Sequence, residues 1–317
     1  MKALLAIDGS HESEMAIETA ASLTWPPDSR VEIISVVPTE VEVFGGPFVV
    51  GVDVQAPEVQ ERLVDDARRL VDEAAERLRR PGLGIAARVL HGRAASTILE
   101  EAERTSAELI IVGAREHGAI ERVLLGSVSA EIVDHARCPV LVARKPTAWR
   151  VLVATDGSPD AALGAGFVAS SGLFDAAGAR VVNVVDVPAA WWLGFTPADG
   201  TLATDAYTTV VTDASGHARS VAADAVRRLR SEGMEAQSVV REGPASAEII
   251  TEAESWGADL VVVGTRGHGL LKRLLLGSTA RTVLHHAPMS VLIVRPSATS
   301  PGGERSPVEP MEALTPA

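Results

Sequence analysis

The sequence has a single cysteine, Cys138, among its 317 residues. A lone cysteine cannot form an intrachain disulfide, and it lacks the paired spacing of zinc-binding and redox-active cysteines. The composition is therefore typical of a protein from a reducing compartment, and we expect the chain to be cytoplasmic.

Long apolar runs and lysines are also scarce. The N-terminal apolar segment, residues 3–7, ends at Asp8, far short of a signal-peptide core or of the roughly 20 residues that span a bilayer. Only three residues are lysines, and Lys+Arg 29 against Asp+Glu 42 gives a net charge of −13. Because cationic surfaces bind phosphate backbones, this charge argues against nucleic acids as partners. The shortness of the apolar segment argues against a membrane as a partner.

An internal duplication is the main feature that is present. The segment at 91–113 aligns without a gap with the segment at 242–264 (242 − 91 = 151): HGRAASTILEEAERTSAELIIVG lies over EGPASAEIITEAESWGADLVVVG. We therefore predict two copies of one domain, residues 1–145 and 150–296, which pack on each other because the linker is short. Residues 297–317 are rich in Ser, Pro, Gly and Glu and are predicted to be a disordered tail.

Short β-branched runs alternate with longer helical patterns in each copy. Helical spacing extends over 57–80, and the strand patterns of the first copy lie near residues 2–7, 31–37, 85–90, 108–112 and 140–143. This alternation is typical of βαβ units with a parallel sheet, and fully apolar strands indicate burial on both faces. Each copy is predicted to be a doubly wound, three-layer α/β domain whose ligands bind beyond the carboxyl ends of the strands.

The first strand of each copy ends in an acid that is followed by Gly-Ser. This acid is Asp8 in the first copy and Asp156 in the second. A carboxylate at this place can accept hydrogen bonds from ribose hydroxyls or from an amino group of a base. The alternative is that the aspartate only assists the turn and the start of the next helix.

The fourth strand of the second copy leads into a glycine pattern. Gly264 and Gly267 are followed, after nine residues, by Gly277 and Ser278. Glycines let backbone N–H groups approach phosphates, and a helix beginning at Ser278 adds a hydroxyl and the positive end of its dipole. The pattern is neither GxxxxGK[ST] nor GxGxxG, so the Walker and Rossmann motifs are absent. Glycines that serve only as tight turns are the alternative.

Together these segments resemble the universal stress protein family. The resemblance rests on ATDGS (154–158), the segment around Gly243 and the stretch VVVGTRGHGLLKRLLLGSTARTVLHHA, which matches the family pattern G-x2-G-x9-G-[S/T]. It implies, for each copy, a five-stranded parallel sheet of order 3-2-1-4-5. It also implies that ATP, with Mg²⁺, binds where the strand order reverses, while the sequence offers no metal-ligand cluster of its own.

The resemblance assigns site residues by position. In the second copy they are expected to hold the base, the ribose and the phosphates, and they are Asp156, Val184, Gly243, Gly264, Gly267, Gly277 and Ser278. Their counterparts in the first copy are Asp8, Val36, Gly92, Gly113, Gly126 and Ser127. There Glu116 stands where the second glycine belongs, so its negative charge is expected to weaken ATP binding by the first copy.

The leading hypothesis is a cytoplasmic ATP-binding stress-response protein in which the nucleotide biases a conformation or the binding of a protein partner. No catalytic residue is assigned, because the sequence has no Ser-His-Asp order and no GxSxG element. Two alternatives stay open. One is a slow ATP-hydrolysing or nucleotidyl-transferring enzyme of the adenine-α-hydrolase-like architecture, and the other is an interaction scaffold that binds no nucleotide.

The last strand of each copy is expected to pair with its counterpart. These strands, 139–142 and 291–294, are apolar, and an exposed apolar edge strand invites pairing. In similar single-domain proteins the corresponding strands pair across a dimer, so we expect them to meet within this chain. Homodimerisation of the whole chain is a further expectation from the resemblance.

Overall fold

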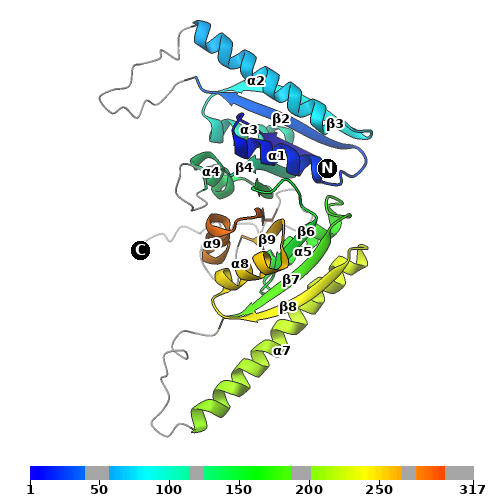
Figure 1. Cartoon of the computed structure of the whole chain (residues 1–317), viewed down its shortest axis with the longest axis vertical. Helices are drawn as coiled ribbons and strands as arrows, with labels where there is room; N and C mark the ends of the chain where they lie inside the picture. The colour runs from blue at the N-terminus through cyan, green and yellow to red at the C-terminus, as the bar shows by residue number, and fades with distance from the viewer. Residues whose placement is uncertain (40–56, 115–124, 187–200, 266–275, 297–317) are drawn as a thin grey trace, which may run out of the picture.

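The two copies have matching successions of strands and helices (Figure 1). The computed structural model describes residues 1–39, 57–114, 125–186, 201–265 and 276–296, and for 201–210 only the helix. The elements of the first copy are β1 (Lys2–Ala6), α1 (His11–Ser22), β2 (Ser29–Val37), α2 (Pro57–Leu78), β3 (Leu83–His91), α3 (Ala94–Thr105), β4 (Leu109–Gly113), α4 (Ser127–His135) and β5 (Val140–Ala143). Those of the second copy are β6 (Arg150–Ala154), α5 (Pro159–Ser170), β7 (Gly178–Val185), α7 (Thr201–Ser231), β8 (Ala236–Glu242), α8 (Ala245–Trp256), β9 (Leu260–Gly264), α9 (Ser278–His286) and β10 (Ser290–Val294).

All these strands form one sheet of ten, in the order β3-β2-β1-β4-β5-β10-β9-β6-β7-β8. Within each half the pairs are parallel, and the order is the 3-2-1-4-5 that the family resemblance implied. The observed strands of the first copy differ from the predicted ranges by no more than a few residues at either end. The doubly wound α/β fold is thereby confirmed.

The helices form a layer on each face of the sheet. Helices α1, α2, α5 and α7 contribute to the core on one face, and α3, α4, α8 and α9 to the core on the other. The central strands are apolar at every position because both of their faces are covered, as Leu109, Ile110 and Ile111 show with no exposed surface. On α2 the residues Val71 and Leu78 are buried, whereas the charged residues lie on the outward face.

Capping residues explain where several helices begin and end. The Ser10 side chain accepts a hydrogen bond from the Ser13 N–H at the start of α1, and Ser158 accepts one from Ala161 at the start of α5. Pro159 occupies the first turn of α5, where the N–H that proline lacks would have no partner within the helix. At its carboxyl end α8 stops at Gly257, whose left-handed φ of 69° favours glycine.

The two copies are joined through their last strands. Strands β5 and β10 are antiparallel, with Leu292 opposite Leu141 and Val142 opposite Val291. The prediction that these strands pair within the chain is confirmed. Because the pairing makes the sheet continuous, each of the two hydrophobic layers runs through both copies, with residues of β5 and β10 in both.

Two arginines connect the helices across this joint. Arg144 follows β5 and donates from Nη2 to the Leu284 carbonyl oxygen near the end of α9, at 2.7 Å. Arg295 follows β10 and donates to the carbonyl oxygens of Val133 and Ala136 at the end of α4. Carbonyl groups at a helix end lack partners within the helix, so each arginine caps the helix of the other copy. The joint therefore fixes the ends of α4 and α9 as well as the strands.

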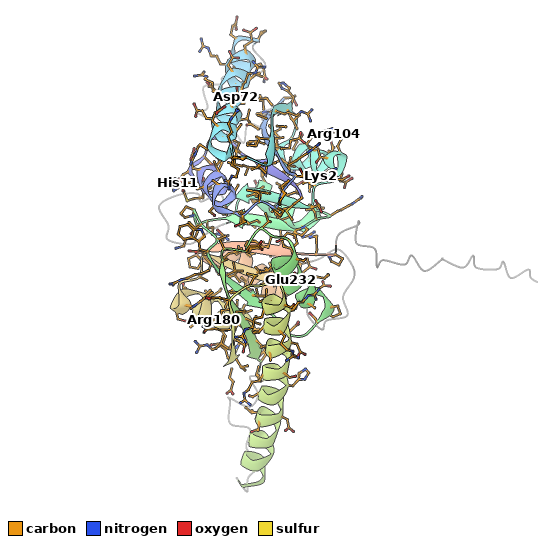
Figure 2. The ribbon with its side chains drawn as sticks, turned by 90° about the vertical axis from the view of Figure 1, so that its right-hand side faces the viewer. Lys2, His11, Asp72, Arg104, Arg180 and Glu232 are labelled. Atoms are coloured by element: carbon orange, nitrogen blue, oxygen red, sulfur yellow. The ribbon has the colours of Figure 1, made fainter. Side chains whose placement is uncertain are left out.

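The longest helices, α2 and α7, lie at the two ends of the molecule (Figure 2). Asp72 marks α2 near one end, and Glu232 follows the last turn of α7. In the same view His11 of α1 and Arg104 of α3 lie on opposite sides of the first copy, as expected for helices on the two faces. None of the helices in the described ranges is both long and apolar enough to cross a membrane.

Candidate functional site

The predicted site residues gather where the strand order reverses. In the second copy the chain moves from β6 outward to β7 and β8, and returns to the other side of β6 to form β9 and β10. Asp156 lies two residues after the end of β6 and Gly264 ends β9, so the two flank the switch point of the sheet. Asp8 and Gly113 have the same places beside β1 and β4. In doubly wound sheets, ligands bind at this crevice.

Both aspartates form the turn that leads into the following helix. Asp156 accepts a hydrogen bond from the Ser158 N–H through Oδ1 at 2.9 Å, and Asp8 accepts one from the Ser10 N–H at 3.0 Å. The intervening glycines have left-handed φ angles of 83° at Gly157 and 78° at Gly9. The turn-forming role that the sequence left as an alternative is therefore confirmed. Both aspartates are nevertheless exposed to solvent, so a ligand can reach them.

The first glycine of the pattern has a packing role that the sequence analysis did not include. A Cβ atom added to Gly264 would lie 2.7 Å from the carbonyl carbon and oxygen of Asp160, in the first turn of α5. A Cβ atom added to Gly113 would lie 2.4 Å from the carbonyl oxygen of Glu12 in α1. Glycine is therefore required in both copies so that the start of a helix can cross the end of the fourth strand.

The second half of the pattern forms a helix N-terminus. Gly126 and Gly277 are the N-caps of α4 and α9, and neither helix has a side-chain cap. Ser127 and Ser278, the first residues of these helices, are exposed. The first-turn N–H groups have no partners within the helix, and the helix dipole is positive at this end. The helix that the sequence predicted to begin at Ser278 is present, and its N-terminus has a chemistry that favours phosphates; phosphate binding there stays a prediction.

The remaining described site residues lie at the ends of the second and third strands. Gly92 and Gly243 follow β3 and β8 with φ angles of 141° and 139°. The Gly243 N–H donates to the Val185 carbonyl at 3.1 Å, which places this loop beside the end of β7. Val184 is half-buried on β7, and Val36 is half-buried at the same position on β2. The structure thus brings these residues to the same edge as the aspartates and the helix N-termini.

Two of the predicted positions lie outside the described residues. These are Gly267 of the second copy and Glu116 of the first, together with the tail at 297–317. The expectation that Glu116 weakens the first site remains a prediction. Within the described ranges, no group of three or more His, Cys, Asp and Glu side chains is arranged to hold a metal ion.

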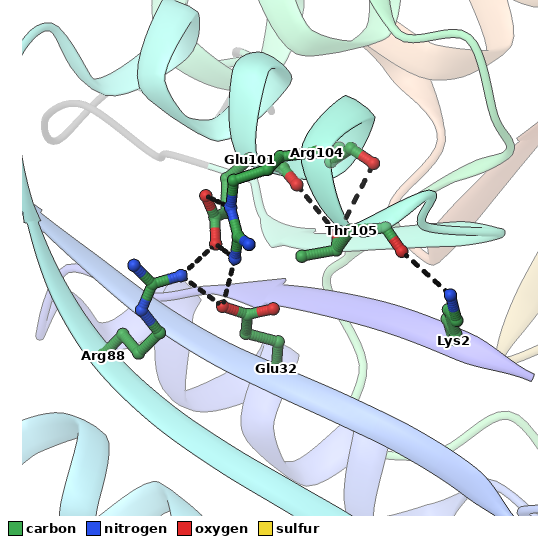
Figure 3. A network of polar contacts seen from close by, with 7 residues as sticks. Lys2, Glu32, Arg88, Glu101, Arg104 and Thr105 are labelled. Carbon is green, nitrogen blue, oxygen red and sulfur yellow. Dashed lines mark hydrogen bonds and ion pairs between the residues drawn. The ribbon is translucent and has the colours of Figure 1, made fainter.

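A cluster of charged residues in the first copy is a second candidate for a site (Figure 3). Glu101 on α3 is 6% exposed and accepts hydrogen bonds from Arg88 Nη1 at 2.5 Å and Arg104 Nε at 2.7 Å. Glu32 on β2 accepts from the same Arg88 Nη1 at 3.0 Å. Close by, Lys2 at the start of β1 donates to the carbonyl oxygen of Thr105. The cluster therefore joins α3 to β2 and β3 across one face of the sheet, and does not lie at the switch point between β1 and β4.

The second copy has a matching cluster. Glu252 on α8 is 1% exposed and accepts from Arg180 Nη1 and from Arg241 Nε, each at 2.7 Å. The Arg180 guanidinium also lies over the Trp256 ring, 4.7 Å from its centroid. Burial raises the pKa of Glu252, but the two arginines outweigh it, so the pKa lies below its ordinary value. Sequence analysis did not identify these carboxylates, although the repeat aligns Glu101 with Glu252 (252 − 101 = 151). The hydrogen-bond partners of Glu101 and Glu252 are arginines of the same copy, which indicates a structural role for both carboxylates.

Acid is expected to weaken the fold through Glu101. The hydrogen bond from Arg104, with the charge of Arg88, lowers the pKa of Glu101 from 4.5 to about 2. A lowered pKa stabilises the folded state fully above about pH 5, and this stabilisation is lost as the pH falls toward about 2. We therefore expect Glu101→Gln to cost stability at neutral pH and progressively less in acid, as measured by urea denaturation.

The comparison is best made in a Glu32→Gln background. Burial raises the pKa of Glu32, so its own contribution has the opposite sign and is coupled to Glu101. The quantity to follow is the difference in free energy of unfolding between Glu32→Gln and Glu32→Gln/Glu101→Gln. A difference that stays constant from about pH 6 down to about pH 2.5 would contradict the assigned role.

Comparisons with known proteins agree with the fold and the duplication. The model of the universal stress protein family matches residues 1–144 and again residues 149–295. A universal stress protein of Mycolicibacterium smegmatis is 29% identical over 300 residues, covering 92% of this chain and 96% of the relative. Universal stress protein Rv2623 of Mycobacterium tuberculosis is 30% identical over 314 residues, covering 93% and 97%.

A solved structure has the same fold over nearly the whole length. The crystal structure of a universal stress protein from Archaeoglobus fulgidus superposes with a TM-score of 0.62 at 18% identity, covering 93% of this chain and 98% of that one. The tandem α/β halves, the family matches to both of them and the relatives of equal length agree with one another. The chain belongs to the universal stress protein family and contains two family domains in tandem.

Proposed function

We propose that the second copy binds ATP at the carboxyl edge of its half-sheet, and that the nucleotide biases a conformation or the binding of a protein partner. The observation that carries the proposal is the N-terminus of α9, which has no side-chain cap and stands at the switch point. Asp156 lies exposed in the turn on the other side of that point. The N-terminus of α9 favours phosphates, and the carboxylate of Asp156 favours hydroxyl or amino groups.

The described residues fit a nucleotide in their chemistry. The N-terminus of α9 offers backbone N–H donors and the Ser278 hydroxyl, Val184 offers an apolar surface, and Asp156 offers a carboxylate acceptor. Mg²⁺ usually keeps several waters and binds mainly through substrate phosphates, so a dedicated protein cage is not required. When bound, the nucleotide supplies the negative charge that the helix N-terminus favours. The residues of this chain bind and orient it.

Extraction of the purified protein separates this proposal from the nucleotide-free scaffold. Acid denaturation followed by anion-exchange chromatography should release ATP or another adenine nucleotide. Where purification has removed the nucleotide, calorimetric titration with Mg-ATP should show binding. Stable ATP over hours supports the binding role, whereas release of ADP, AMP or pyrophosphate would indicate the enzyme. If no nucleotide is recovered and the titration shows no heat of binding, the proposal is wrong.

Replacing Asp156 with alanine is expected to weaken ATP binding. Loss of one polar anchor costs about 1 to 3 kcal/mol, which is roughly a 5- to 150-fold loss of affinity. Calorimetric titration of the wild-type and variant proteins measures the change. Asp175→Ala is the matched control, because Asp175 is an exposed aspartate before the amino end of β7. Equal affinity in Asp156→Ala and Asp175→Ala would show that the site has been misplaced.

A further inference from the structure

Thr265 links three elements that surround the proposed ATP site of the second copy. It follows β9 directly and is 7% exposed. Its hydroxyl Oγ1 donates to Oδ2 of Asp160, in the first turn of α5, at 2.6 Å. Its carbonyl oxygen accepts from the N–H of Gly277, the N-cap of α9, at 2.8 Å. One buried residue thus ties the first turn of α5, which follows the Asp156 turn, to the helix N-terminus that is proposed to bind the phosphates.

The first copy lacks this connection. Ala114 occupies the position of Thr265 (265 − 114 = 151) and has no hydroxyl, and Glu12 occupies the position of Asp160 (160 − 12 = 148). Ala114 and Gly126 are both described, yet no hydrogen bond joins them as one joins Thr265 and Gly277. Instead, the Ser129 hydroxyl of α4 donates to the Gly113 carbonyl at 2.7 Å. The two copies therefore hold the same edge of the sheet in different ways.

We propose that Thr265 is a positioning residue that holds the ATP site of the second copy in its binding geometry and makes that site the tighter of the two. The inference rests on the proposed function. A site whose parts are already in place loses less conformational freedom on binding, so more of the interaction energy appears as affinity. Thr265 acts on the ligand through Asp160 and Gly277 and makes no contact with the ligand itself.

The test compares two replacements of similar size. Thr265→Val keeps the branched shape and removes the hydroxyl, whereas Thr265→Ser keeps the hydroxyl and removes a methyl group. We expect Thr265→Val to weaken Mg-ATP binding by about tenfold, and Thr265→Ser to bind within about threefold of the wild type. Affinities are measured by calorimetry at a temperature where circular dichroism shows all three proteins folded. Hydrogen exchange of the Gly277 N–H, measured without nucleotide, should be faster in Thr265→Val than in the wild type.

Two further measurements separate positioning from general stability. In Thr265→Val/Asp160→Ala the loss of affinity should not exceed that of the larger single variant, because both changes break the same hydrogen bond. Transfer of the pair to the first copy, as Ala114→Thr/Glu12→Asp, should strengthen ATP binding at that site. The double transfer also provides a gain of function that a purely destabilising change does not give.

The outcomes separate a failure of the positioning role of Thr265 from a failure of the proposed ATP binding. If wild-type protein binds ATP and Thr265→Val binds it equally tightly, the positioning role is overturned while the proposed function stands. The same holds if Thr265→Val and Thr265→Ser weaken binding to the same extent, because the hydroxyl is then irrelevant. If the wild-type protein binds no ATP, the proposed function fails and the role of Thr265 fails with it.

Discussion

Replacing Gly113 with alanine is expected to lower the free energy of unfolding by about 3 kcal/mol, and Gly264→Ala by slightly less. The added Cβ atom would lie 2.4 Å from the Glu12 carbonyl oxygen in the first case and 2.7 Å from that of Asp160 in the second. Contacts this short require the structure to shift. Because the opposing atoms belong to the backbone, no side-chain rotation relieves them, and the start of α1 or α5 must move away from the sheet.

The measurement is urea denaturation of each variant beside a matched glycine replacement. Gly178 starts β7, and a Cβ atom added there meets no atom within 4 Å. Gly178→Ala is therefore expected to change stability by no more than about 0.5 kcal/mol. Equal stability of Gly113→Ala and Gly178→Ala would show that α1 adapts to the added atom without cost, contrary to the packing argument.

This packing requirement changes how the glycine pattern is interpreted. The first glycine is needed in both copies for the crossing of a helix over a strand end, whether or not a nucleotide binds. Its presence at 113 and 264 therefore carries little information about ATP. The positions that bear on the ligand are the helix N-terminus at Gly277 and Ser278, which lacks a side-chain cap, and the exposed carboxylate of Asp156.

Most of the fold could be predicted from the sequence because its signals are local or repeated. Apolar runs such as 109–112 mark buried strands, and the ungapped alignment of 91–113 with 242–264 shows two equal units. Family resemblance then supplied the strand order, and the apolar last strands predicted the joint. The site edge followed from the same reasoning, since the assigned residues that the structure describes lie at the ends of strands, just after them, or at the starts of the following helices.

The contacts that could not be predicted join residues far apart in the chain. Thr265 and Asp160 are separated by 105 residues, and neither residue type signals a buried hydrogen bond between them. Arg180 and Glu252 are 72 residues apart, and the sequence around Arg180 does not mark it as the partner of a buried carboxylate. Their pairing depends on how α8 lies across β7, which is set by packing of the whole domain rather than by a local pattern.

Replacing Glu252 with alanine is expected to lower the free energy of unfolding by about 3 kcal/mol. The change leaves Arg180 and Arg241 beside a void that the carboxylate filled, and both lose their charged acceptor. An uncompensated buried charge costs about 3 to 5 kcal/mol, and the lower end applies because the side chains of Arg180 and Arg241 are 25% and 40% exposed and can gain water.

The same replacement in the first copy is expected to cost less, and the comparison tests the cause. In Glu101→Ala the carboxylate of Glu32 remains to accept from Arg88, and Arg104 is 58% exposed. Urea denaturation should therefore rank the losses as Glu252→Ala first, then Glu101→Ala, then Glu254→Ala, which removes an exposed glutamate from the same helix as Glu252. If Glu252→Ala is no less stable than Glu254→Ala, the two arginines find adequate partners elsewhere and the buried carboxylate does not hold α8 on the sheet.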